Sequence, residues 1–275
     1  MSNKVTTLIT TDKAVANNAK RLSICLRSNG FSFSIVTLDQ VLLTFGQADF
    51  DFNLQLGELS QAIKDFFVEN DINTFEMRQM SLIVPSDNFA WIPEHLYDAA
   101  YDRQYLKMVG NPDMNLGTYH CYVPLLGSYM AFSAQTTIIA AFKIALPGID
   151  VHSQHTILVN ETLMKRSMQH PLMVMHVRSE MTDIEAFYAN QLLLSNSFVS
   201  RTRDEMLYHT IDVMKQLHLE TPDMELAICG DVDRELYGFL QHYFPNVTLY
   251  TGRPTSFINS EFNTFPTYKH ALLLS

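Results

Sequence analysis

Cysteine, glycine and proline are scarce in this chain of 275 residues, and each scarcity excludes a class of architecture. Ten glycines and ten prolines are too few for a collagen-like chain or for a disordered low-complexity chain. The three cysteines, Cys25, Cys121 and Cys229, are odd in number and lie about a hundred residues apart, so no disulfide framework is implied. Each has apolar sequence neighbours, as a reduced core thiol would have, and this favours a cytoplasmic protein.

Long apolar runs are also missing from the sequence. No run reaches the roughly 18 to 20 residues that a membrane-spanning helix requires. The nearest candidate, residues 136–149, is interrupted by Lys143 and then by Pro147-Gly148. Residues 1–8 contain no apolar core of signal-peptide length. The sequence therefore predicts no membrane insertion, which agrees with a cytoplasmic location.

Basic residues are outnumbered by acidic ones. Asp and Glu number 29 and Lys and Arg 19, so the formal net charge is −10. This balance argues against duplex nucleic acid or an anionic membrane as the main partner. The remaining composition, 47% hydrophobic and 17% charged, is ordinary for a globular protein. At about 150 residues per domain, the length predicts two domains or two lobes.

A weak internal repeat is found when the chain is compared with itself at a shift of 151 positions. The shift aligns Leu26-Arg27-Ser28 with Val177-Arg178-Ser179, and residues 39–44 with residues 190–195, without a gap. Five of these pairs are identical. The pattern of expected elements supports the repeat more strongly than the identities do.

Each copy of the repeat predicts three strands, a helix, a strand and a second helix. The strands are expected at residues 22–27, 31–37 and 40–45, followed by 80–84, and at 172–178, 182–188 and 192–198, followed by 224–229. Alternation of Phe31, Phe33 and Ile35 with serines indicates a half-buried antiparallel strand. Thr202 and Glu205 form a capping-box pattern at the start of one helix. Pro93 in one copy, and Asp231 or Asp233 in the other, are expected to open the second helix.

The stretch between the two copies is less regular. Residues 119–126 and 155–159 are expected to form strands, and residues 134–146 a buried helix. We place the boundary near residue 162, which divides the chain into an N-terminal lobe of residues 1–162 and a C-terminal lobe of residues 163–275. The fold class expected is α/β, with two β-β-β-α-β-α lobes whose mixed sheets are flanked by helices.

This repeated β-β-β-α-β-α order resembles the actin-like ATPase superfamily, whose two ribonuclease H-like lobes face each other across a nucleotide cleft. The run Leu82-Ile83-Val84-Pro85, followed by Phe89 and by residues 91–96, is similar to the strand, proline and helix of the pilus-assembly and type II secretion actin-like proteins. The whole chain also resembles a bacterial family of uncharacterised proteins with this fold. The resemblance covers residues 20–250 and implies a cleft between the lobes.

The chain departs from that superfamily at the residues that hold nucleotide. Working members carry an Asp-x-Gly-Thr/Ser type loop in the first hairpin of each lobe, where Asp holds water or magnesium and amides hold phosphate. Here the hairpins read Leu-Arg-Ser-Asn-Gly at residues 26–30 and Val-Arg-Ser-Glu-Met at 177–181. The adenosine-side Gly-Gly motif is reduced to Gly230-Asp231. We therefore expect no catalytic residue and no cofactor, since ATP with magnesium is not supported by the motifs.

The same segments supply the candidate ligand-binding residues. These are Arg27, Ser28, Asn29, Gly30, Arg178, Ser179, Gly230 and Asp231. Two guanidinium groups with neighbouring hydroxyls could hold a phosphate or carboxylate between them. The alternative is that each arginine is solvated at a turn and paired with a surface acid. Asp231 or Asp233 can equally be the N-cap of the following helix.

Two further groups of residues were considered as sites. His120-Cys121 and His152-x-x-His155 are the only hints of metal ligation, but no zinc-site spacing accompanies them, so structural histidines and no metal are expected. Trp91 is the best surface anchor for a protein partner, with burial beneath the following helix as the alternative.

The leading hypothesis is a non-catalytic, actin-like-fold protein that acts as an interaction or scaffold protein. An unidentified protein is then the expected partner. The alternatives are a divergent nucleotide-binding switch or ATPase that uses Arg27 and Arg178 on phosphate, and a pocket between the lobes for another small anion.

Overall fold

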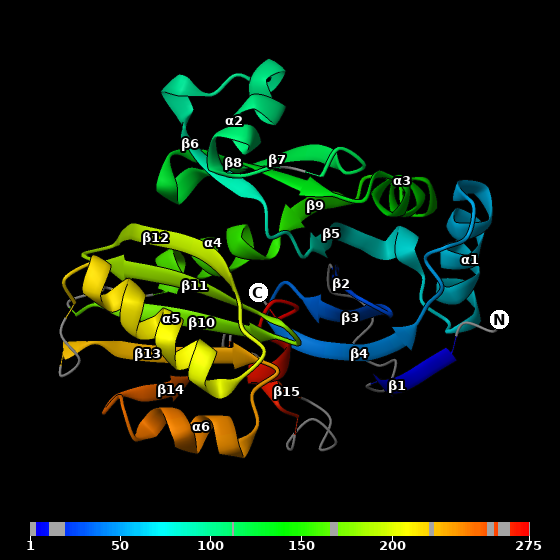
Figure 1. Cartoon of the computed structure of the whole chain (residues 1–275). Helices are drawn as coiled ribbons and strands as arrows, with labels where there is room; N and C mark the ends of the chain where they lie inside the picture. The colour runs from blue at the N-terminus through cyan, green and yellow to red at the C-terminus, as the bar shows by residue number, and fades with distance from the viewer. Residues whose placement is uncertain are drawn as a thin grey trace.

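Two mixed β-sheets lie at the centres of two lobes in the computed structural model, and a smaller sheet projects from the first lobe (Figure 1). The structure describes residues 4–10, 20–111, 113–165, 170–219, 223–251, 256–257 and 265–274. The predicted α/β class, with mixed sheets flanked by helices, is confirmed.

The first lobe is built on a sheet with the strand order β1-β4-β3-β2-β5-β9, to which a short β15 adds beside β4. Its strands are β1 (Lys4–Thr10), β2 (Lys20–Arg27), β3 (Gly30–Thr37), β4 (Val41–Asp49), β5 (Met77–Val84), β9 (Asp150–Ser153) and β15 (Ser256–Phe257). Strands β2, β3 and β4 form an antiparallel meander, and β5 and β9 continue the sheet in parallel with β2. Helices α1 (Leu56–Glu69) and α3 (Thr136–Ala145) pack against each other on this lobe.

The second lobe has the corresponding order β12-β11-β10-β13-β14. Its elements are β10 (Leu172–Arg178), β11 (Met181–Tyr188), β12 (Gln191–Val199), α5 (Arg203–Gln216), β13 (Glu225–Gly230), α6 (Arg234–Gln241) and β14 (Val247–Leu249). Strands β13 and β14 run parallel to β10, as β5 and β9 run parallel to β2. The expected β-β-β-α-β-α order is therefore present in the second lobe, whereas in the first lobe the three strands, the helix and the fourth strand are followed by β6 (Phe89–Pro93) instead of a second helix. The capping box at Thr202 and Glu205 is also confirmed.

Strand β3 is buried on both faces, so the prediction of a half-buried strand is wrong. Phe31 and Phe33 point into the lobe core, where they meet the rings of Phe66 and Phe67 on α1. The serines that alternate with them are buried too. Ser34 donates a hydrogen bond of 2.7 Å to the carbonyl oxygen of Leu273, so the polar face of the strand is covered by a segment 239 positions away in the chain.

That covering segment, residues 265–274, lies between the two lobes, where Figure 1 shows the end of the chain. Ala271 and Leu272 belong to an apolar cluster that includes Ile83 of the first lobe and Ala227 of the second. Leu273 and Leu274 pack instead with β3 and β4. The segment thus contributes apolar contacts to both lobes.

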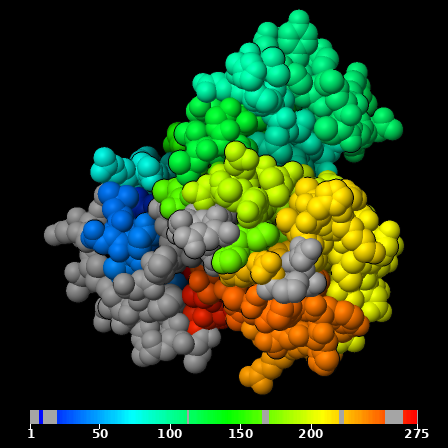
Figure 2. All heavy atoms as spheres, turned by 90° about the vertical axis from the view of Figure 1, so that its left-hand side faces the viewer, coloured from blue at the N-terminus to red at the C-terminus, as the bar shows by residue number. Residues whose placement is uncertain are grey.

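A three-stranded sheet, formed within residues 89–134, projects from the first lobe (Figures 1 and 2). We call it the insert; it comprises β6 (Phe89–Pro93), α2 (Asp102–Val109), β7 (Gly117–Val123) and β8 (Ser128–Ala134). Pro93 was expected to open a helix, and this prediction is wrong. Pro93 is the last residue of β6, where it pairs with Ser128 of β8. Two short 3-10 turns, at residues 94–96 and 99–101, follow it before α2 begins.

The strand predicted at residues 155–159 is also wrong, because these residues belong to α4 (Gln154–Lys165). His155, Leu158, Val159 and Thr162 are all buried, at the three- and four-residue spacing of one helix face. A short apolar run has no periodicity that separates a strand from a buried helix turn. The boundary expected near residue 162 falls inside α4, which packs against strands of both lobes. No helix in the described ranges is long and apolar enough to cross a membrane.

The segment between the lobes leads to a first prediction. Replacing Leu272 by alanine removes a buried side chain from a cluster shared by both lobes, and we expect a loss of about 2–5 kcal/mol in the free energy of unfolding. Urea unfolding followed by circular dichroism measures it. The matched control is Leu249→Ala on β14, where the side chain is 40% exposed and the expected change is below about 0.5 kcal/mol. Equal effects of the two substitutions would refute the assigned role of the segment.

Candidate functional site between the lobes

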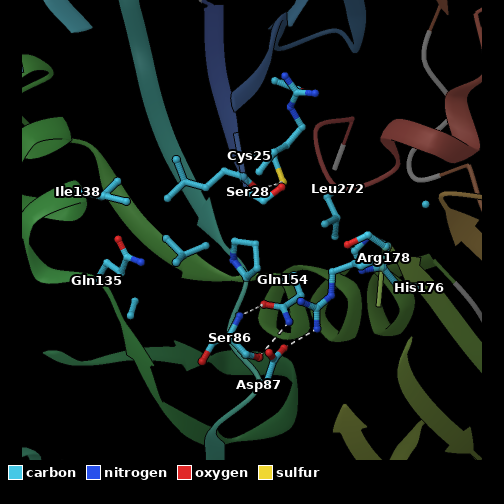
Figure 3. Close-up of a pocket in the computed structure, with 18 of the residues that line it drawn as sticks. Cys25, Ser28, Ser86, Asp87, Gln135, Ile138, Gln154, His176, Arg178 and Leu272 are labelled. Atoms are coloured by element: carbon cyan, nitrogen blue, oxygen red, sulfur yellow. Dashed lines mark hydrogen bonds and ion pairs between the residues drawn. The ribbon is translucent and has the colours of Figure 1, made fainter. Parts of the chain in front are cut away.

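A cavity of about 820 Å³ lies where the two lobes and the insert meet. Its walls come from the β2–β3 hairpin, the loop after β5, the start of α3, the β10–β11 hairpin, the end of β13 and residues 269–273. Figure 3 shows labelled residues of both lobes lining the same space. A volume of this size suits a small-molecule ligand. Of the eight predicted site residues, seven line the cavity, and Gly30 does not.

The first-lobe hairpin presents Arg27, Ser28 and Asn29 to this cavity. Nη2 of Arg27 donates to the carbonyl oxygen of Ala48 at 3.1 Å and lies 3.6 Å from Asp49. Its Nε is buried and has no hydrogen-bond partner among the described residues. Gly30 has a packing role, because a Cβ at this position would collide with the carbonyl oxygen of Ala48 on β4.

Arg178, on the second-lobe hairpin, is held by two carboxylates. Its Nε and Nη2 donate to the two oxygens of Asp183 at 2.9 and 2.6 Å, a bidentate pair. Nη2 also donates to Asp87, in the loop after β5, at 2.6 Å, and Figure 3 shows this contact across the lobes. Burial lowers the pKa of Arg178, but Asp183 and Asp87 more than offset it and the pKa is raised. The guanidinium therefore connects the lobes, and its positive charge is balanced by two carboxylates.

Asp183 is the centre of a buried polar network. Besides Arg178, it accepts hydrogen bonds from Ser197 Oγ at 2.6 Å and Gln154 Nε2 at 3.4 Å, and its Oδ2 lies 3.0 Å from His176 Nδ1. The side chain is fully buried. Burial alone would raise its pKa, but the surrounding positive charges and hydrogen bonds hold the pKa far below the usual range of an aspartate. Asp183 is thus a stable carboxylate inside the protein.

The contacts among Glu185, His155 and Ser197 resemble those of a serine-hydrolase triad, with the histidine between the carboxylate and the hydroxyl. His155 Nδ1 contacts Glu185, and its Nε2 lies 3.0 Å from Ser197 Oγ. Ser197, however, donates its only hydroxyl proton to Asp183. Burial lowers the pKa of His155, but the neighbouring carboxylates of Glu185 and Asp183 more than offset this and the pKa is raised. Because the hydroxyl proton of Ser197 is directed to Asp183, and the side chains of His155 and Glu185 are fully buried, the three residues are best explained as part of the structural network.

The glycine and aspartates after β13 have local roles. Gly230 adopts φ +88°, and a Cβ there would collide with the carbonyl oxygen of Val177. The amide of Asp231 donates to that same oxygen at 2.8 Å. Asp233, and not Asp231, is the N-cap of α6 and accepts a hydrogen bond from Leu236 N at 2.7 Å. Asp231 remains on the cavity wall, where its negative charge would oppose a bound anion.

The residues considered for metal ligation are dispersed. His120 contacts Asp102, 2.8 Å away, whereas the thiol of Cys121 is buried and lies 3.1 Å from the carbonyl oxygen of Val151. In the described part of the chain, no group of three or more His, Cys, Asp or Glu side chains could hold a metal ion. The cavity thiol, Cys25, is half-buried, and its loss of solvation raises its pKa to about 12 and keeps it neutral. Trp91 packs against the core clusters on the inner face of β6 and is not an exposed anchor.

Sequence reasoning missed the acidic members of the network, Asp87, Asp183 and Glu185. One signal was present in the sequence. Asp183 and Glu185 alternate with Ile184 and Ala186 on the strand predicted at residues 182–188, so both fall on one face of it. Because the partners His155 and Asp87 come from distant segments, the pairing became visible only in the folded chain.

Comparison with known proteins agrees with this architecture. A family model described as "Protein of unknown function (DUF3822)" matches residues 10–247. The search of curated proteins found no significant match. A Bacteroides thetaiotaomicron protein of unknown function with an actin-like ATPase fold is similar, with TM-score 0.72 and 22% identity over 87% of this chain and 93% of that one. The chain is also similar to a structure of the PilM-PilN type IV pilus biogenesis complex, with TM-score 0.57 and 11% identity over 94% and 97% of the two chains. These likenesses establish the actin-like ATPase fold.

The ion-pair network leads to a second prediction. Arg178→Ala leaves the buried carboxylate of Asp183 without its guanidinium, and we expect a loss of about 3–5 kcal/mol in the free energy of unfolding. The control is Arg203→Ala, whose pair with Glu235 is exposed on both sides, and whose effect should stay below about 1 kcal/mol. Chemical denaturation measures both. A loss for Arg178→Ala as small as that of the control would contradict the buried-charge account.

A third prediction concerns His270, on the cavity wall between the rings of Phe45 and Phe265. Burial, with the nearby charges of Lys269 and Arg27, lowers its pKa from 6.5 to about 4. Stability present above pH 6.5 is therefore lost as the pH falls towards 4, because only the unfolded state takes up the proton. Between pH 6.5 and pH 4, the free energy of unfolding of the His270→Phe variant should fall less than that of the natural chain. The difference between the two decreases is at most about 3 kcal/mol. Urea unfolding between pH 4 and 8 measures the difference, which should be constant above pH 7.

Proposed function

The chain belongs to the DUF3822 family, and on that premise we propose that it is a non-catalytic protein of the actin-like ATPase fold that acts by binding another protein. The observation that carries the proposal is the identity of the residues at the two hairpin tips. Working ATPases of this superfamily use an aspartate there to hold water and magnesium, whereas this chain has Arg27 and Arg178.

The surroundings of Arg178 support the same proposal. Phosphoryl transfer depends on charges placed around the transferring group, with metal ions neutralising the phosphate oxygens. Here the second-lobe tip holds a guanidinium that is already neutralised by Asp183 and Asp87. This arrangement joins the lobes through an ion pair at the place where a catalytic site would need a metal-bound aspartate. The similarity to the structure of the PilM-PilN complex is consistent with a role in binding a protein partner.

A second candidate function is the binding of a small anion in the cavity without catalysis. Arg27 and Lys269 both line the cavity, and Lys269 has no carboxylate within ion-pair distance among the residues described. Their positive charges, with the hydroxyl of Ser28, form a more suitable anion site than the pair Arg27 and Arg178. In this second candidate function, the cavity between the lobes binds a ligand without magnesium.

The fourth prediction separates these functions from an ATPase. The thermal stability of the full chain is measured alone and with millimolar Mg-ATP, Mg-ADP, Mg-GTP or inorganic phosphate, together with ATP turnover. The interaction role predicts no turnover and no shift. A ligand at 100 times its dissociation constant would add about 2.7 kcal/mol, a shift of several degrees for a chain of this size.

Variants then distinguish the two candidates from each other. A shift with phosphate or a nucleotide that Arg27→Ala or Lys269→Ala removes, and that Arg203→Ala retains, would favour the anion site. Arg203 serves as the control because it lies on α5 and not on the cavity wall. Magnesium-dependent ATP turnover that Arg27→Ala abolishes would overturn the non-catalytic proposal.

A further inference from the structure

Four tyrosine rings lie in sequence on the outer face of the insert, and we call Tyr105, Tyr97, Tyr129 and Tyr122 the tyrosine ladder. Tyr97 and Tyr129 are stacked with ring centroids 3.9 Å apart and planes 10° apart. Tyr122 adjoins Tyr129 at 4.8 Å, and Tyr105 adjoins Tyr97 at 6.1 Å. The function proposed above does not involve any of these rings.

The alternation of the strands places the ladder on the outer face. Tyr122 on β7 is directly opposite Tyr129 on β8. Their neighbours, Cys121 and Met130, point the other way and belong to the first-lobe core. The inner face of the insert is therefore anchored in the protein, and the outer face is left to carry the aromatic side chains.

Hydrogen bonds hold the rings of the ladder in place. The hydroxyl of Tyr122 donates to Glu94 at 2.8 Å, and that of Tyr97 donates to Asp102 at 2.9 Å. The hydroxyl of Tyr105 donates to the carbonyl oxygen of Leu96 at 3.0 Å. Rings that are already fixed lose little conformational freedom on binding, which is why tyrosine is effective at protein interfaces.

Exposed apolar side chains are concentrated around the ladder. Of the twenty large apolar side chains that are exposed in the described part of the chain, seven lie between residues 94 and 125. They are Leu96, Tyr101, Met108, Val109, Met114, Tyr122 and Leu125. The insert also projects from the body of the molecule, as Figure 2 shows at the top of the view, so a partner can approach it without meeting the lobes. Such a concentration on a projecting element is typical of an interaction surface.

Acidic side chains adjoin the ladder. Residues 94–102 contain Glu94, Asp98 and Asp102 and no lysine or arginine. Arg103 and Lys107 lie on α2, and Arg103 is directed to the carbonyl oxygen of Met114. His120 adjoins Tyr97 and lies 2.8 Å from the buried Asp102, so Glu94 and Asp98 are the carboxylates exposed beside the rings. Carboxylates beside aromatic rings attract cationic side chains through both Coulomb and cation–π interactions.

We propose that the outer face of the insert is the docking surface for a basic segment of a partner protein, in which lysine or arginine alternates with aliphatic residues. The cationic groups meet Glu94, Asp98 and the rings of the ladder, and the aliphatic groups cover Leu96 and Leu125. The proposal rests on the interaction role proposed above and assigns it a surface and a partner chemistry.

The fifth prediction tests this surface with the full chain. A phage library of random twelve-residue peptides is selected on the natural chain, with counter-selection on the variant Leu96→Ser/Tyr122→Ser/Leu125→Ser. These side chains are 62%, 40% and 55% exposed, so the variant should fold, which its circular dichroism and thermal unfolding check. We expect the retained peptides to be rich in lysine or arginine beside aliphatic residues. Retention of acidic or uncharged peptides, or of none, would overturn the proposal.

A synthetic copy of the most enriched peptide is then titrated calorimetrically against paired charge variants. Glu94→Gln/Asp98→Asn should weaken binding at least tenfold. Glu58→Gln/Asp65→Asn removes the same number of charges from α1 and should leave the affinity within twofold. Equal losses in the two pairs would show general attraction to an acidic protein and contradict the proposed surface. The result is independent of nucleotide turnover, so the failure of this surface can be distinguished from the failure of the interaction role.

Discussion

A carboxylate enclosed in a protein interior is costly unless positive charge and hydrogen-bond donors surround it, and the structure around Asp183 depends on this constraint. Arg178 satisfies it with a bidentate pair, and Ser197 adds a hydroxyl donor. Because Arg178 also reaches Asp87 across the lobes, satisfying one buried charge fixes the relation between two sheets. The hairpin that would hold phosphate in an ATPase has thereby become part of the interface between the lobes.

The same constraint explains the character of the cavity. The second-lobe arginine is neutralised, and Asp231 adds negative charge to that wall, so positive charge is concentrated at Arg27 and Lys269. The space between the lobes is therefore lined by charges of both signs. The outer surfaces are available for function as well, and the insert carries seven of the large apolar side chains that are exposed in the described residues.

Regular elements could be predicted from the sequence wherever one segment determines its own structure. The hairpins around residues 28–30 and 179–180, the capping box at Thr202 and the apolar faces of α1 and α5 all depend on local spacing. Errors arose where distant segments decide. Residues 155–159 became a helix, and β3 became buried on both faces, because the packing of α4 and of residues 265–274 is not encoded near either segment.

The candidate site shows the same division. The sequence by itself determined that Arg27 and Arg178 occupy equivalent positions at two hairpin tips, because the two hairpins have the same register. Only the tertiary structure decided that Arg178 is bound by Asp183 and Asp87 while Lys269 of the C-terminal segment remains beside the cavity. The physical reason is the separation in sequence between the residues that interact. Turns and strand alternation follow from neighbouring residues, whereas the partner of a buried charge is chosen by which distant segments the fold brings within about 3 Å.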